Sequence, residues 1–166
     1  MTDHKRYMLR HFLAALAYRT QKALGGADDD YATFEAGNLT RTPLELVRHM
    51  TSVLGYARTH FRGGSYRAEP LSSFDDEVHR FHDMLGDLSR HLEEGDALED
   101  TTPEQLLQGP FADAMTHAGQ LAMLRRLHGA PVAPENFIVA AIDTSDVGED
   151  QAEPKSPDEE WPERLT

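Results

Sequence analysis

Residues 42–50 read TPLELVRHM, and this stretch carries the clearest structural signal in the chain. Thr42 is suited to cap a helix, Pro43 to occupy its first position and Glu45 to close a capping box. An apolar stripe follows at helical spacing until Gly63-Gly64 ends the pattern, and its members are Leu46, His49, Met50, Val53, Leu54 and Ala57. The stretch therefore predicts an amphipathic helix with a histidine on its apolar face.

Three further segments show the same period, and each stops at a glycine. We expect helices over residues 4–24, from residue 72 or 73 to 94, and over 110–128 after a turn at 102–104. Helices of about 20 residues are ~30 Å long and pack as a four-helix bundle. We therefore predict an all-α four-helix bundle over residues 1–142. The long connections after the first and second helices permit topologies other than up-down-up-down.

Composition excludes several classes of function. The 166 residues include no cysteine, which rules out a disulfide scaffold, a Cys-ligated zinc site, an iron–sulfur cluster and a thiol nucleophile. A net charge of −13, from 16 Lys+Arg against 29 Asp+Glu, argues against binding nucleic acid. No apolar run approaches the ~20 residues that span a bilayer, and the first residues lack the pattern of a signal peptide. We expect a soluble cytoplasmic protein that binds neither nucleic acid nor membrane.

The acidic residues are concentrated at the C-terminal end. Residues 143–166 contain nine acidic residues against two basic ones, together with three prolines and few apolar side chains. Such a segment cannot bury enough apolar surface to offset the entropy lost on ordering. We therefore predict an acidic, disordered extension, with an arm anchored by Trp161 on a neighbouring subunit as the alternative.

Three polar side chains are predicted to lie close together on two helices. His49 lies between Leu46 and Val53 on the face expected to be buried, and Asp113 and His117 are spaced i,i+4 on the last helix. A carboxylate on a buried face is costly unless it is paired or binds a metal. One interpretation is a simple Asp113–His117 pair. The other is a metal site, because two imidazoles and one carboxylate are typical of catalytic zinc and of non-haem iron.

The remaining histidines are weaker candidates. His79 and His82 form an i,i+3 pair on the third helix and are the best competing ligands. His60 lies ~16 Å further along its helix than His49, which is too far to share an ion. His128 bears the same relation to His117, and its place before Gly129 favours a contact with the helix end.

The segment from Asp113 to Gly129, DAMTHAGQLAMLRRLHG, resembles the fourth-helix signature of the DinB-like metalloproteins. In that family the pattern is commonly His-x-x-x-His-Arg-Gly-Gln-Leu, followed by an arginine-containing turn and a glycine, and a histidine on the second helix matches His49. The chain departs from the pattern at Asp113, where the family usually has histidine, and at Ala118, where it has arginine. Because aspartate is a competent ligand, the resemblance implies a metal bound by His49, Asp113 and His117.

The resemblance also implies a class of chemistry. Similar proteins transfer low-molecular-weight thiols, isomerise with mycothiol, or are presumed hydrolases. A divalent ion deprotonates a thiol that coordinates it, and the thiolate is the nucleophilic form. We expect zinc, with nickel or iron as alternatives, and a small-molecule thiol and an electrophilic substrate as partners of a homodimer. A hydrolase would use the same ion to activate water.

Two other classes remain open at this point. The bundle could be a non-catalytic, metal-stabilised stress or binding protein, with the acidic tail as its interaction element. A ferritin-like di-metal oxidase is a weaker alternative, since such sites need Glu-x-x-His on two helices. Glu45 precedes His49 by four residues rather than three.

Overall fold

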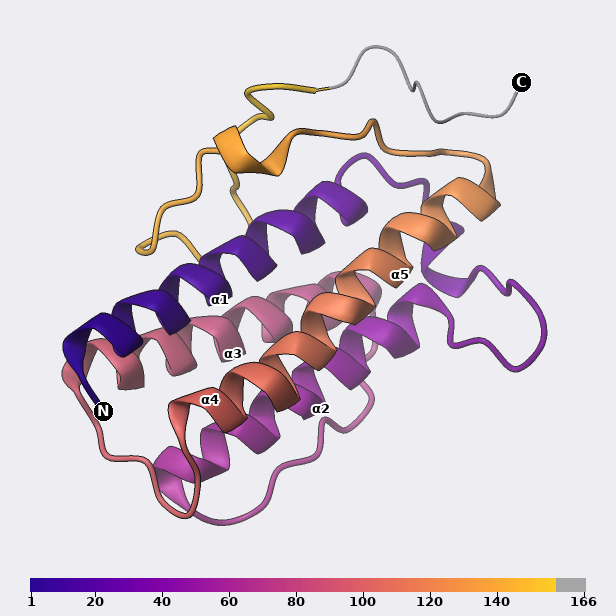
Figure 1. Cartoon of the computed structure of the whole chain (residues 1–166). Helices are drawn as coiled ribbons and strands as arrows, with labels where there is room; N and C mark the ends of the chain where they lie inside the picture. Colours follow the sequence, from indigo (N-terminus) through magenta and orange to yellow (C-terminus); the bar gives the residue numbers. More distant parts are fainter. Residues whose placement is uncertain (158–166) are drawn as a thin grey trace.

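A computed structural model describes residues 1–157 of the chain, and residues 158–166 lie outside that description. The described chain is helical and confirms the predicted all-α four-helix bundle (Figure 1). Its elements are α1 (Asp3–Leu24), α2 (Pro43–Arg62), α3 (Phe74–Glu94), α4 (Pro103–Leu106) and α5 (Ala112–His128). The capping box at Thr42 and Glu45 forms as expected, with Pro43 at the start of α2. Within this part of the chain no helix is long and apolar enough to cross a membrane.

The helices are arranged as two parallel pairs. Arg48 contacts Glu77 and Arg58 contacts Asp87, so α2 and α3 keep a constant offset of 29 residues and run in the same direction. The ends of α1 and α5 also meet, because the guanidinium of Arg125 donates to backbone carbonyls of residues 23–26. The long crossover of residues 63–73 allows α2 and α3 to be parallel neighbours.

The last helix differs from its predicted form. The sequence predicts a turn at 102–104 and a helix from about Pro110. In the structure Thr102 and Gln105 form a second capping box that opens α4, and a π-helical turn over Leu107–Phe111 joins α4 to α5. The backbone departs from helical geometry at Gly109, which precedes Pro110. A residue before proline is disfavoured in helical conformation, so the kink lies where the sequence requires it.

The core lies between the four long helices. Leu13, Leu16, Met50, Leu85 and Leu121 are fully buried there. Tyr31, from the short 3-10 turn after α1, closes one end of the bundle, and its hydroxyl donates to the carbonyl of Leu121 at 2.7 Å.

Residues 130–157, here called the C-terminal segment, run back across α1 (Figure 1). Glu135 is buried and accepts hydrogen bonds from the Tyr18 hydroxyl at 2.8 Å and from Lys22 Nζ at 3.0 Å. This carboxylate fixes the start of the segment to the surface of α1.

The predicted disordered extension begins at residue 143, yet the first part of that stretch contacts the bundle. Val147 packs against the core, and its carbonyl lies 2.7 Å from Nδ1 of the buried His82. A backbone carbonyl that accepts from a buried side chain provides an anchor that composition does not reveal. Residues 158–166 of the predicted extension, Trp161 among them, lie outside the described residues.

Candidate metal centre

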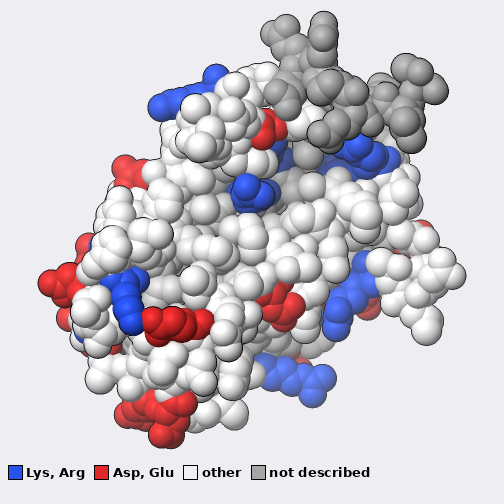
Figure 2. Space-filling view, viewed as in Figure 1, with Lys and Arg blue, Asp and Glu red and all other residues white. Residues whose placement is uncertain are grey.

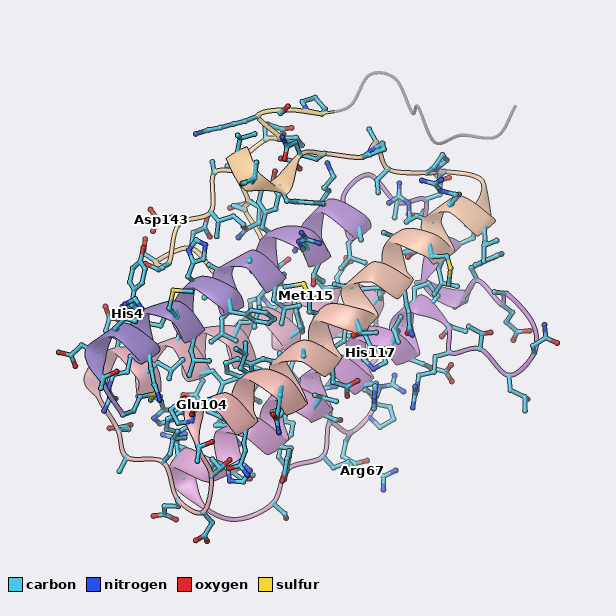
Figure 3. The ribbon with its side chains drawn as sticks, viewed as in Figure 1. His4, Arg67, Glu104, Met115, His117 and Asp143 are labelled. Atoms are coloured by element: carbon cyan, nitrogen blue, oxygen red, sulfur yellow. The ribbon has the colours of Figure 1, made fainter. Side chains whose placement is uncertain are left out.

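Three side chains with metal-ligating atoms meet between α2 and α5. His49 comes from the second turn of α2, and Asp113 and His117 come from the first two turns of α5. One donor atom from each lies within 4.8 Å of the other two. Figure 3 shows His117 on α5 where this helix passes over α2. The structure thus brings together the three residues that the sequence places on two helix faces.

The orientation of His117 is set by its neighbour Gln120. His117 Nδ1 lies 2.8 Å from Gln120 Oε1, and an amide oxygen only accepts, so Nδ1 carries the proton. The other ring nitrogen, Nε2, then has its lone pair free, and it lies 3.4 Å from Asp113 Oδ1. A hydrogen bond from the second nitrogen is the usual way that proteins orient a ligating histidine.

His49 faces His117 from the opposite helix. The two rings lie 4.8 Å apart between centroids and are nearly perpendicular, at 77°. Burial lowers the pKa of His49, and the neighbouring Arg41 and His117 lower it further, against the opposing effect of Asp113. A lowered pKa keeps the imidazole neutral, which is the form that binds a metal ion.

The cluster is open to solvent on one side. The sequence predicts that Asp113 faces the core, but its side chain is 51% exposed, whereas that of His117 is 9% exposed. Asp113 lies in the first turn of α5, just after the π-helical turn, at the outer edge of the α2–α5 contact. The cost of burying a carboxylate therefore does not apply here, and the argument for a metal rests on the convergence of the donors.

A cavity of about 470 Å³ adjoins the cluster. Gln120 lines it and holds His117, and Leu46 lines it one turn before His49. The remaining lining comes from α5 and from the loop before α2, and consists of Met123, Leu124, Leu39, Thr40 and Arg41.

The loop beside this cavity is strained. Asn38 and Leu39 have positive φ angles of 53° and 60°. Such angles are unfavourable for residues other than glycine. They are less costly for Asn38, whose short polar side chain can bond to the local backbone, than for Leu39, which has no such group. Strain of this kind is often found beside functional sites.

The competing histidines have other partners. His82 is buried, but its two ring nitrogens contact Gln21 and the carbonyl of Val147. His79 is exposed and lies beside Glu149. His60 Nδ1 lies 3.2 Å from the carbonyl of Glu99. A second acidic group, at the far end of α5, consists of Asp28, Asp30 and His128, and both of its aspartates are exposed.

Sequence reasoning missed three residues that shape the site. Gln120 follows His117 by three residues and so lies on the same helix face, a signal that was available. Arg41 gave no signal, because a loop residue shows no periodicity. Glu77 is fully buried on α3, and its carboxylate pairs with Arg48, the residue before His49. This ion pair secures the α2 side of the site.

The donor set fits a divalent transition metal. Two ligands of a tetrahedral zinc ion, each about 2.0–2.1 Å from it, lie ~3.4 Å from each other. His117 Nε2 and Asp113 Oδ1 are separated by 3.4 Å. Among the described residues no further acid or histidine joins this group, so three protein ligands would leave coordination positions for a substrate. Within the described chain no second carboxylate lies with His49, Asp113 and His117, as a di-metal centre would require.

No protein-family model, curated protein or solved structure matches this chain. The resemblance to DinB-like proteins therefore rests on the residues quoted above.

Proposed function

We propose that the chain is a DinB-like protein that binds one divalent transition metal, zinc in the first place, through His49, Asp113 and His117. We further propose that it transfers a low-molecular-weight thiol to an electrophilic substrate. The observation that carries the metal proposal is the contact between His117 Nδ1 and Gln120, which leaves Nε2 facing Asp113 within the cluster of three donors.

The chemistry follows from the ligands and from the lack of cysteine. Because the chain has no thiol of its own, the reacting thiol must come from a small molecule. A divalent ion at this site would supply one thing, the deprotonation of a thiol that coordinates it. The thiolate then attacks an electrophilic carbon, a carbon–sulfur bond forms as the leaving group departs, and the thiol proton passes to solvent.

The adjoining cavity supports a small-molecule substrate. Its volume of about 470 Å³ falls in the usual range of ligand pockets. Leu46, Met123 and Leu124 offer apolar contacts, and the exposed Arg41 adds a positive charge beside the cluster. Among the described residues Arg41 has no acidic partner, so its charge is available to attract an anionic group.

Metal binding is tested by His117→Ala, with His128→Ala as the matched control. Both histidines lie on α5 beside an aspartate, but only His117 belongs to the proposed site. We expect the wild-type protein and His128→Ala to bind one zinc per chain in a titration. His117→Ala should bind zinc at least ~100-fold more weakly with unchanged helix content. Loss of zinc binding in His128→Ala, with binding retained in His117→Ala, would show that the metal is bound by Asp28, Asp30 and His128 instead.

Thiol transfer is tested separately on the zinc-loaded protein. Cysteine, glutathione and mercaptoethanol are each paired with an aryl halide, and consumption of thiol is followed with and without a chelator. Turnover that disappears with the chelator and in His117→Ala supports the transferase. Stoichiometric zinc without any turnover would favour the non-catalytic binding protein instead. Light scattering on the same sample tests the homodimer against the 18.6 kDa chain mass.

A further inference from the structure

A second cavity of about 470 Å³ lies on the other side of α5, between this helix and α1. Figure 3 shows Met115 on the α1 side of α5, in contrast to His117, which faces α2. The floor of the cavity consists of small residues, Ala23 from α1 and Ala118, Gly119 and Ala122 from α5. The cavity is therefore separated from the metal centre by the thickness of one helix.

The mouth of this cavity is basic in an acidic protein. Arg19, Lys22 and Arg126 line it, and none of the described residues that line it is acidic. Figure 2 shows blue side chains flanking the uncharged surface between the upper parts of α1 and α5. Lys22 is paired with Glu135, while the guanidinium of Arg19 lies over the ring of Phe137, 3.8 Å from its centroid. A stacked arginine keeps its full charge, so among the residues that the structure describes Arg19 gives the mouth a positive charge with no acidic neighbour.

The C-terminal segment covers the cavity with apolar side chains. Val132, Pro134 and Phe137 line it from this segment. Their position is secured by Glu135, whose buried carboxylate accepts hydrogen bonds from Tyr18 and Lys22 of α1. The cavity thus has an apolar floor, an apolar cover and a cationic mouth.

We propose that the cavity between α1 and α5 binds a small amphipathic anion, one apolar chain or ring that carries a single carboxylate. The apolar body lies over Ala118, Gly119 and Ala122, and the carboxylate meets Arg19 at the mouth. The volume suits one small ligand and not a peptide or a lipid with two chains. A neutral or cationic analogue lacks the partner for Arg19 and binds more weakly.

The glycines of the chain provide a matched pair of variants. A Cβ added at Gly119 meets no atom within 4 Å, and the same holds for Gly86 on α3. Leucine at either position is compatible with the helix and raises its propensity. Gly119→Leu fills the cavity, whereas Gly86→Leu adds the same side chain elsewhere.

The experiment measures binding of octanoate, octanol and octylamine to the full chain by calorimetry and ligand-observed NMR. Octanoate should bind the wild-type protein and Gly86→Leu equally, and Gly119→Leu at least ~10-fold more weakly, as expected when a side chain occupies a small-ligand pocket. Arg19→Gln should reduce the preference for octanoate over octanol. Helix content measured by circular dichroism shows that each variant is folded, and Arg19→Gln tests the proposal even where Gly119→Leu does not fold.

A carboxylate could also bind a metal ion, so the same titration is repeated with His117→Ala. Unchanged octanoate binding in that variant places the ligand in the α1–α5 cavity. Binding that is lost with His117→Ala, binding that survives Gly119→Leu, equal binding of octylamine, or no octanoate binding to the wild-type protein would each overturn the proposal.

Discussion

Helix α5 has two cavities of about 470 Å³ on two of its faces, and they differ in the polar groups that line them. The cavity on the α2 side is lined by Gln120, which holds His117, by Arg41 of the loop, and by apolar residues such as Leu46 and Leu124. On the α1 side lie small apolar residues, and the positive charges are confined to the mouth. Met123 lines both cavities. The comparison shows that residues two or three positions apart on one helix can line hollows with different polar groups, Gln120 and Arg41 in one and the basic residues of the mouth in the other.

The covers of the two cavities differ as well. Loop residues 39–41 close the α2 side, and Leu39 is fully exposed there. The C-terminal segment closes the α1 side and is fixed by a buried carboxylate. The two covers therefore differ in how they are held, one by an exposed loop and the other by a buried ion pair. Each variant below should change one side and leave the other intact.

The largest effect is expected from Glu135→Ala. This change leaves the buried Tyr18 hydroxyl without its acceptor and Lys22 without its partner. Such losses cost about 2–3 kcal/mol of unfolding free energy, which lowers the melting temperature of a chain of this size by about 5–10 °C. Calorimetry measures the change, and zinc affinity should stay the same. The control is Glu153→Ala, an exposed acid of the same segment, which should shift the melting temperature by less than ~2 °C.

A smaller effect, confined to the α2 side, is expected from Gln120→Leu. Without the amide oxygen, His117 Nδ1 loses its acceptor and the ring is no longer oriented. Zinc affinity should fall about 10- to 100-fold, as measured by competition with a chelating dye. Gln120→Glu keeps an acceptor and should retain most of the affinity, and the exposed Gln108→Leu should retain all of it. Equal loss in the Leu and Glu variants at position 120 would contradict the orienting role.

The smallest effect is a pH dependence of the contact between the C-terminal segment and His82 of α3. Burial lowers the pKa of His82 below its ordinary value of 6.5. As the pH falls through that value, His82 is protonated in the unfolded chain before it is protonated in the folded chain, so the unfolded chain binds more protons. The stability that depends on neutral His82 is therefore present at neutral pH and is lost as the pH falls. The groups that face this ring are Gln21, the Val147 carbonyl, Asp146, Glu149 and His79. His82→Gln should flatten the dependence of melting temperature on pH between about 7.5 and 5.5.

His79 provides a control with the opposite sign. Its bond to Glu149 raises the pKa of this exposed imidazole, so its contribution is present at acid pH and disappears as the pH rises. His79→Ala should therefore steepen the acid loss of stability slightly at low salt, and high salt should remove the difference. The same change of slope in both variants would show that neither histidine acts as described.

The sequence predicts the helices better than it predicts their surroundings. The cap at Thr42, the terminating glycines and the apolar period are local signals, and the helices α1, α2 and α3 follow them closely. These signals suffice because each depends on residues within one or two turns of the chain.

The start of the last helix shows how two local signals can compete. Proline is common at the first position of a helix, which favours a start at Pro110. Thr102 and Gln105 form the same type of capping box that opens α2, and this signal marks the true start at Pro103. The helical path then kinks at Gly109 and continues. The capping box was therefore the better guide.

The meeting of His49, Asp113 and His117 could be anticipated because each lies on a helix face whose direction follows from the period. The exposure of Asp113 was missed, because periodicity gives the direction of a side chain but not where the neighbouring helix ends. The position of Arg41 and the burial of Glu135 over α1 could not be anticipated either. Both are set by tertiary contacts between distant parts of the chain.

The parallel arrangement of α1 and α5 has an electrostatic consequence. Each helix has a macrodipole whose negative end is its C-terminus, and in a parallel pair the two negative ends lie side by side. Arg125 is buried at this junction and donates to five carbonyls, those of Ala23, Leu24, Gly25, Gly26 and Ala130. Its guanidinium therefore offsets the repulsion of two dipoles while it satisfies the free carbonyls at the end of α1. A lysine has one nitrogen and could not reach five acceptors, so the planar fork of arginine is what lets the two helices end together.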